Sequence, residues 1–134
     1  GFICFFGDAP LQWGAKKQSS TAPSTMAAEY IALSEAAKEA VFLRDRASQL
    51  TKVEVPVSIY CDNIAAQMIA NGEVGHASKG AKHIELRHHF VKEMVEEGKV
   101  TVTRIPTDLN VADIFTKPLS RPIFEPFRDS LNVV

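Results

Sequence analysis

This sequence of 134 residues has little net charge, few cysteines and no long apolar run. Its formal charge is −1, so nucleic-acid binding would have to rely on a local cluster of basic residues. No apolar run approaches the roughly 20 residues of a membrane span, and the start of the chain lacks a signal-peptide pattern. The two cysteines, Cys4 and Cys61, both fall in predicted strands. That placement favours buried, reduced thiols in an intracellular protein over a disulfide.

The remaining composition is that of one small globular domain. Hydrophobic residues make up 46% of the chain and charged residues 23%, which is enough apolar material for a single core. We therefore expect one domain over residues 1–134. Residues 120–134 are expected to form a C-terminal tail, as a short helix or an extended segment, with no chemistry that the sequence identifies.

The most informative single residue is Asp62. Residues 55–60 (VPVSIY) are rich in β-branched and aromatic side chains, which predicts a buried strand, and residues 63–69 (NIAAQMI) restart at helical spacing. Asp62 is thus expected where the carboxyl end of a strand meets a helix, the edge at which open α/β sheets bind ligands. The alternative is an acid that only accompanies a helix N-terminus.

A second acid, Glu29, stands at the head of an apolar helical stripe. Residues 25–50 contain no glycine or proline and are rich in alanine, glutamate, leucine and lysine, which predicts a helix of several turns. An acid in that place either lies at the solvated rim of the core or is held by a cation. Steps of three and four from Glu29 give the stripe: Leu33, Ala36, Ala40, Leu43 and Ala47.

A third acid, Asp113, follows the strand-like segment 100–106 (VTVTRIP). Asn110 is placed to cap a helix that begins there, which would put Asp113 in its first turn. An acid in a first turn also stabilises the helix dipole, so this position alone is ambiguous.

Five motifs in the same order carry a resemblance to a known family. With these motifs the chain resembles the ribonuclease H domain of copia-type retrotransposon Pol polyproteins, and together they extend over nearly the whole sequence. One departure is Ala15, which stands where the family has serine. The matching segments are residues 11–20 (LQWGAKKQSS), 24–33 (STMAAEYIAL), 60–63 (YCDN), 82–90 (KHIELRHHF) and 111–119 (VADIFTKPL).

The resemblance implies an α/β fold with a ribonuclease H-like mixed sheet of five strands flanked by helices. It also implies a cluster of four acids that holds two Mg²⁺ or Mn²⁺ ions and cuts the RNA strand of an RNA/DNA hybrid. Two hard cations about 4 Å apart require oxygen ligands, which explains the residue types. Position by position, Glu29, Asp62 and Asp113 match three of the four catalytic, metal-binding acids.

The family's first, central strand and the acid on it have no counterpart in this sequence. Residues 1–8 (GFICFFGD) match the family's second strand and the turn after it. Asp8 falls in that turn, where aspartate is ordinary. We therefore expect an N-terminally truncated domain that does not cleave by itself, being a fragment, a decayed copy or a domain that has recruited another central strand.

Basic residues gather in one segment and at the end of an early strand. Expected nucleic-acid contacts are Lys16, Lys17, Lys79, Lys82, His83 and Arg87. His83 and Arg87 are four residues apart and share a helix face that is suited to phosphates. The alternative is a solvated helix, because glutamates are interleaved with the basic residues. No cysteine or acid–histidine pattern accompanies the histidines, which argues against zinc.

Two functions remain open at this stage. One is a ribonuclease H acting in retrotransposon reverse transcription. The other is a non-catalytic domain of the same fold that binds nucleic acid or protein. The resemblance implies as partners an RNA/DNA hybrid and the reverse transcriptase and integrase portions of the same polyprotein, with no membrane. The implied location is intracellular, in cytoplasmic virus-like particles or in the nucleus.

Overall fold

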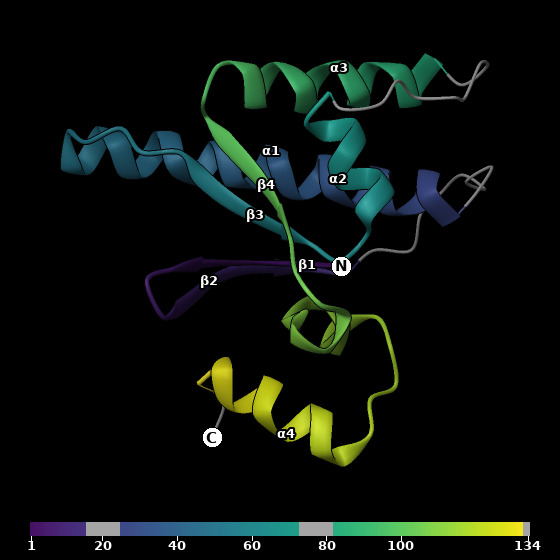
Figure 1. Ribbon diagram of the computed structural model, residues 1–134. Helices are drawn as coiled ribbons and strands as arrows, with labels where there is room; N and C mark the ends of the chain where they lie inside the picture. Colours follow the sequence, from purple (N-terminus) through teal and green to yellow (C-terminus); the bar gives the residue numbers. More distant parts are fainter. Residues whose placement is uncertain (16–24, 73–81, 133–134) are drawn as a thin grey trace.

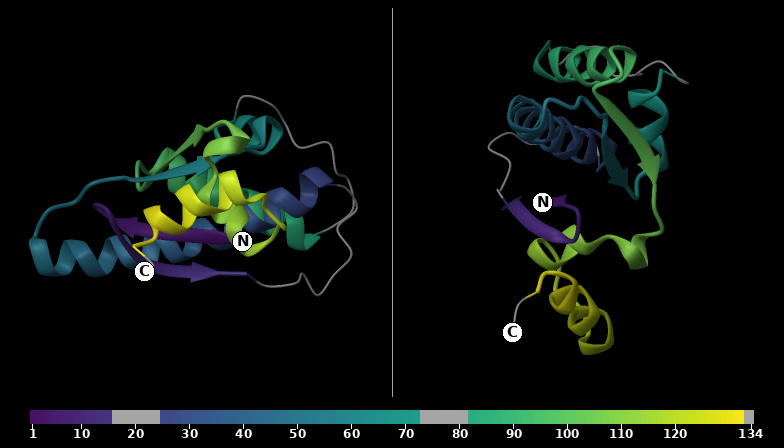
Figure 2. Two further views of the ribbon diagram at one scale, coloured as in Figure 1. Left: turned by 90° about the horizontal axis from the view of Figure 1, so that it is seen from below. Right: turned by 90° about the vertical axis from the view of Figure 1, so that its left-hand side faces the viewer.

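A computed structural model describes residues 1–15, 25–72 and 82–132 of the chain (Figure 1). It is an α/β structure in which α3 and α4 lie at opposite ends (Figures 1 and 2). In chain order the elements are β1 (Phe2–Phe6), β2 (Ala9–Gly14), α1 (Thr25–Thr51), β3 (Val57–Cys61), α2 (Ile64–Ala70), α3 (Lys82–Glu96), β4 (Val100–Arg104), the 3₁₀ helices η1 (Thr107–Leu109) and η2 (Val111–Phe115), and α4 (Arg121–Ser130).

The described strands form two separate sheets of two strands each. β1 and β2 make an antiparallel hairpin that turns at Gly7 and Asp8, where Gly7 adopts a φ of +59° that suits glycine. β3 and β4 pair in parallel, with α2 and α3 between them in the chain. The sequence predicted two sheet pieces without a shared partner, and among the described strands this is confirmed.

Helix α1 links the two sheets, because it contacts β1 of one and both β3 and β4 of the other. It ends at Thr51, and the next residue, Lys52, has a φ of +59° in the left-handed region and donates its N–H to the Ser48 carbonyl at 2.8 Å. Arg44 then fastens the segment after the helix by donating from Nε to the carbonyl of Val55 at 3.0 Å. These contacts turn the chain back along α1 into β3.

The core lies where β3 and β4 meet the helices α1, α2 and α3. Its buried side chains come from those five elements, and none of the described residues of β1 or β2 is among them. Tyr30 and Leu33 of α1, Ile59 of β3 and Val91 of α3 are typical members. The hairpin is therefore held mainly at its contacts with α1 and η2.

Most predicted elements are present, with two differences in detail. The strand before Asp62 begins at Val57 and not at Val55. Asp113 lies in a short 3₁₀ helix and not in an α-helix. The C-terminal tail takes the first of its two expected forms, a short helix over Arg121–Ser130. Cys4 and Cys61 are both free. None of the described helices combines the length and apolar character needed to cross a membrane.

Candidate functional site

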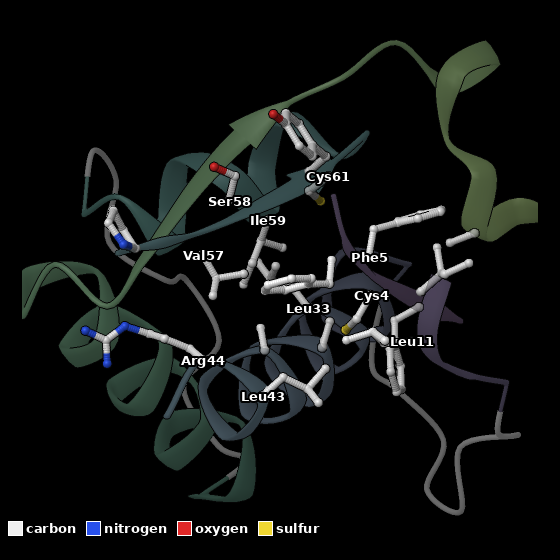
Figure 3. Close-up of a pocket in the computed structure, with 18 of the residues that line it drawn as sticks. Cys4, Phe5, Leu11, Leu33, Leu43, Arg44, Val57, Ser58, Ile59 and Cys61 are labelled. Carbon is white, nitrogen blue, oxygen red and sulfur yellow. The ribbon is translucent and has the colours of Figure 1, made fainter. Parts of the chain in front are cut away.

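An open groove of about 800 Å³ runs between the two sheets, above α1. Figure 3 shows Val57 and Ile59 of β3 on one side, Cys4 and Phe5 of β1 on the other, and Leu33 of α1 between them. The predicted α1 stripe forms the floor, since all of its members line the groove: Glu29, Leu33, Ala36, Ala40, Leu43 and Ala47. The stripe is therefore only partly covered by the rest of the chain.

Two of the three predicted acids line this groove. Glu29 lies near the start of α1 and is half-buried. Asp62 directly follows β3 and is also half-buried. Asn63, next in the chain, caps α2 by accepting a hydrogen bond from the Ala66 N–H at 2.9 Å. Because Asn63 provides the cap, the carboxylate of Asp62 is not used for that purpose.

Asp113 is positioned by the short helix η2. Asn110 caps this helix by accepting from the N–H of Ala112 at 3.3 Å, as the sequence predicted. Asp113 is buried, with 8% of its surface exposed, and its Oδ2 accepts a hydrogen bond from Lys117 Nζ at 2.8 Å. The residues before it, from Asn110 to Ala112, line the groove.

The three acids act together on one ammonium group. The pKa of Lys117 is raised above its ordinary value, first by the hydrogen bond to Asp113 and further by the charges of Asp113, Asp62 and Glu29. The thiol of Cys61 also has a raised pKa, mainly through burial, with contributions from Asp62 and Glu29. Carboxylates that are far apart in the sequence thus share one electrostatic neighbourhood.

The three acids do not form a complete metal site among the described residues. Three carboxylates are the right kind of donor for Mg²⁺ or Mn²⁺. However, in the part of the chain that the structure describes, no three histidine, cysteine, aspartate or glutamate side chains lie close enough together to hold a metal ion. The donor set therefore fits in chemistry and is incomplete in arrangement, and Lys117 is the cation that Asp113 contacts.

The sequence alone assigned no function to Lys117, although this residue lies in the 111–119 motif. Its spacing of four residues from Asp113 is the signal that would have found it, because residues four apart in a helix face one another. Lys117 lies just after η2, and its backbone N–H still donates to the Asp113 carbonyl at 3.0 Å.

The predicted basic residues are only partly described. Lys16, Lys17 and Lys79 lie outside the described residues, and so do the side chains of Lys82 and His83 at the start of α3. Arg87 is described, and it faces inward to α1. Its guanidinium donates to Ser34 Oγ at 3.1 Å and forms an ion pair with Glu35. Arg87 therefore joins α3 to α1 in this structure.

His88, next in the chain, stacks on Tyr30 of α1 with ring centroids 5.8 Å apart. The stacking adds a second contact between α3 and α1.

The chain is similar to retrovirus-related Pol polyproteins from plant transposons. It is 33% identical over 135 residues to the retrovirus-related Pol polyprotein from transposon RE2 of Arabidopsis thaliana, an alignment that takes in 100% of this chain. It is 32% identical over 134 residues to the corresponding polyprotein from transposon RE1 of the same plant, and 34% identical over 125 residues to that from transposon TNT 1-94 of Nicotiana tabacum. The alignments cover 99% and 93% of this chain.

The chain spans only 9% of the length of each of these three polyproteins. No protein-family model matches the sequence, and no solved structure matches the fold. The relatives thus show similarity to a segment of transposon Pol polyproteins, and they do not name the activity of that segment.

Proposed function

We propose that this chain corresponds to the ribonuclease H portion of a transposon Pol polyprotein, and that the 134 residues alone do not cleave RNA/DNA hybrid. The observation that carries the proposal is the placement of the three acids: Glu29 and Asp62 line one groove, and Asp113 directly follows the groove-lining residues Asn110 to Ala112. The charges of all three also raise the pKa of Lys117. These acids come from three separate elements, α1, the end of β3 and η2. Similarity to a segment of Pol polyproteins, over the whole of this chain, supports the same assignment.

In this proposal Glu29, Asp62 and Asp113 would hold Mg²⁺ or Mn²⁺, two ions in the intact site. Bound divalent ions supply charge neutralisation at the phosphate and lower the pKa of a bound water. The chain contributes three carboxylates and, as described, gathers no complete ligand set. That shortfall is the reason why we expect no useful cleavage rate from this chain, since misplacing one catalytic group commonly costs orders of magnitude.

The proposal extends to partners and location. The substrate would be an RNA/DNA hybrid, and the reverse transcriptase and integrase portions of the same polyprotein would be its neighbours. The location would be intracellular, in cytoplasmic virus-like particles or in the nucleus.

The test is cleavage of a labelled RNA/DNA hybrid in Mg²⁺ and in Mn²⁺. The 134-residue chain is compared with a longer version that includes the adjoining Pol segment and with that version carrying Asp62→Asn. We expect cleavage only by the longer version, with a loss of about 10³-fold or more in the variant. Robust cleavage by the 134-residue chain, abolished by Asp62→Asn, would show that it already contains a complete site, with Asp8 the first residue to test.

The same experiment separates the second candidate, a non-catalytic domain that binds nucleic acid or protein. The incomplete ligand set in the described residues is the observation that favours it. If the longer version binds hybrid in a gel-shift assay and leaves it intact in both metals, the non-catalytic function is supported and the nuclease is excluded.

A further inference from the structure

We propose that Arg87 of α3 and Ser34 of α1 form a joint that positions Glu29 in the candidate site. Neither residue touches substrate or metal in this proposal, so both are positioning residues. Their contact holds the first turns of α1 in the place that the carboxylate of Glu29 requires. The kinetic part of the inference rests on the proposed ribonuclease function, and its structural part is tested without cleavage.

Helix α1 presents two neighbouring faces to the rest of the chain. Glu29 and Leu33 line the groove. Tyr30 and Ser34, each one position later, do not line it and are buried, with 3% and 0% of their surface exposed. Residues one position apart differ by about 100° around a helix, so this second face lies beside the groove-lining face. The acid and the joint therefore belong to the same turns of one helix.

Two contacts join the second face of α1 to α3. The guanidinium of Arg87 donates to Ser34 Oγ at 3.1 Å and forms an ion pair with Glu35. The ring of His88, the next residue, stacks on that of Tyr30 with the planes 29° apart. Figure 1 shows α3 beside the amino-terminal part of α1, with the carboxyl end of α1 extending past it. The contacts thus act on the part of α1 that contains the acid.

Ser34 is one of two buried polar or charged residues in the part of the chain that the structure describes. A buried hydroxyl costs free energy unless it has a hydrogen-bond partner, and Arg87 is that partner. The side chain of Arg87 is 27% exposed, so solvent screens the contact less than it screens a surface ion pair. The joint therefore favours one alignment of the two helices, because only that alignment satisfies the buried hydroxyl.

Glu29 depends on such a joint because its side chain is not fixed directly. Among the described residues its carboxylate makes no hydrogen bond or ion pair, whereas Asp113 is held by Lys117. The distance from Glu29 to Asp62 is thus set by where α1 lies against β3. Ligands of a catalytic site must be held within about 0.5 Å, and a misplacement of about 1 Å can lower the rate about 100-fold.

The alternative for Arg87 is direct contact with a phosphate, as the sequence predicted. Losing a phosphate contact weakens hybrid binding, which raises KM, and makes binding less dependent on salt. Losing a positioning contact lowers kcat and leaves KM and the salt dependence unchanged. Ser34 separates the two cases, because a fully buried side chain cannot touch a phosphate.

The kinetic experiment is a double-mutant cycle in the longer version that includes the adjoining Pol segment. Arg87→Met and Ser34→Ala are made singly and together, and kcat, KM and the salt dependence are measured with labelled hybrid in Mn²⁺. We expect Arg87→Met to lower kcat by about tenfold or more, Ser34→Ala to lower it in the same direction, and the double variant to be no slower than Arg87→Met. KM should change by less than about twofold.

The matched control is Lys92→Met. Lys92 is also a cation of α3, but it pairs with Glu96 of the same helix, so its kinetics are expected to equal those of the wild type. A raised KM with a weaker salt dependence in Arg87→Met, together with unchanged kinetics in Ser34→Ala, would overturn the joint in favour of a phosphate contact. Additive losses in the double variant would also overturn it, because two residues that act through one contact lose that contact only once.

Hydrogen exchange of the same variants, without metal or hybrid, tests the joint independently of cleavage. Amides of residues 27–35 are expected to exchange about fivefold faster in Arg87→Met and in Ser34→Ala, with β3 and β4 unchanged. Should Arg87→Met not fold, Ser34→Ala, which removes one oxygen atom, provides the same reading. Unchanged exchange at residues 27–35 would refute the joint. Faster exchange in variants of an inactive longer version would support the joint and exclude the ribonuclease, so the two failures are distinguishable.

Discussion

Lys117 donates a hydrogen bond from Nζ to Oδ2 of Asp113 at 2.8 Å, and the pair spans the turn that ends η2. The aspartate side chain is 11% exposed and the lysine side chain 50% exposed. Replacing the lysine leaves a largely buried carboxylate without this cation, whereas solvent already screens part of the interaction. We therefore predict that Lys117→Met lowers the free energy of unfolding by about 1 kcal/mol, as measured by urea denaturation.

The control for this prediction is Lys38→Met. Its ion pair with Glu35 joins two side chains that are each 48% exposed, so the expected loss is smaller. A Lys38 variant that loses as much stability as the Lys117 variant would contradict the assigned importance of the buried aspartate.

Glu35 should make the stability of the domain depend on acid pH. The hydrogen bond from Arg87 holds the pKa of Glu35 below its ordinary value of 4.5, with further help from Lys38. A carboxyl group whose pKa is lower when folded stabilises the fold above the unfolded value and loses that contribution as pH falls through the folded value. Because Glu35 is half exposed, the contribution is less than about 1 kcal/mol.

The measurement for Glu35 is a series of urea melts from about pH 6 to about pH 2.5. Glu35→Gln is expected to lose stability less steeply than the wild type below about pH 4.5. Glu93→Gln, at an exposed position on α3, is expected to follow the wild type. Parallel curves for wild type and Glu35→Gln would exclude the ion pair in solution.

Both cysteines are expected to be slow to alkylate in the folded state. Burial raises the pKa of Cys4 and of Cys61, and only the thiolate is an efficient nucleophile. Mass spectrometry after iodoacetamide treatment at neutral pH should show Cys4 modified first, because Cys61 is the more buried. Urea should make both react quickly. Rapid modification of Cys61 without denaturant would contradict its placement in β3.

Phe127 anchors α4. It is the buried residue of that helix, which packs on η2, so Phe127→Ala is expected to release α4 while leaving the main core intact. Hydrogen exchange should become faster in α4 and remain unchanged in α1 and β3, with a loss of about 2 kcal/mol or more in the docking of α4. Ile123→Ala, at a residue that is 40% exposed, is the control with a smaller expected effect. A cooperative loss of protection in α1 would show that α4 is part of the central folding unit.

Local patterns predicted much of this fold. The three- and four-residue spacing from Glu29 identified the α1 stripe that floors the groove, and the change from strand-like to helical spacing placed Asp62 at the end of β3. The cap by Asn110 was predicted from its residue type and position. Each of these depends on neighbours in the sequence.

What the sequence did not predict depends on contacts between distant segments. Arg87 was expected to face phosphates, and in the structure it binds Ser34 and Glu35, more than fifty positions away in the chain. The sequence likewise did not predict that the described residues of β1 and β2 contribute no side chain to the buried core. This depends on how α1 packs against both sheets. The role of Lys117 required knowing that the charges of three acids, distant in the sequence, all raise its pKa.

The end of α1 has a consequence for engineering this domain. Lys52 occupies a left-handed backbone conformation that glycine adopts readily and that other residues adopt at a cost of about 1–2 kcal/mol. The lysine is exposed and does not line the groove, although its neighbours Thr51 and Val53 do. Lys52→Gly is therefore expected to raise the stability of the domain at this one position without removing any side chain that lines the groove.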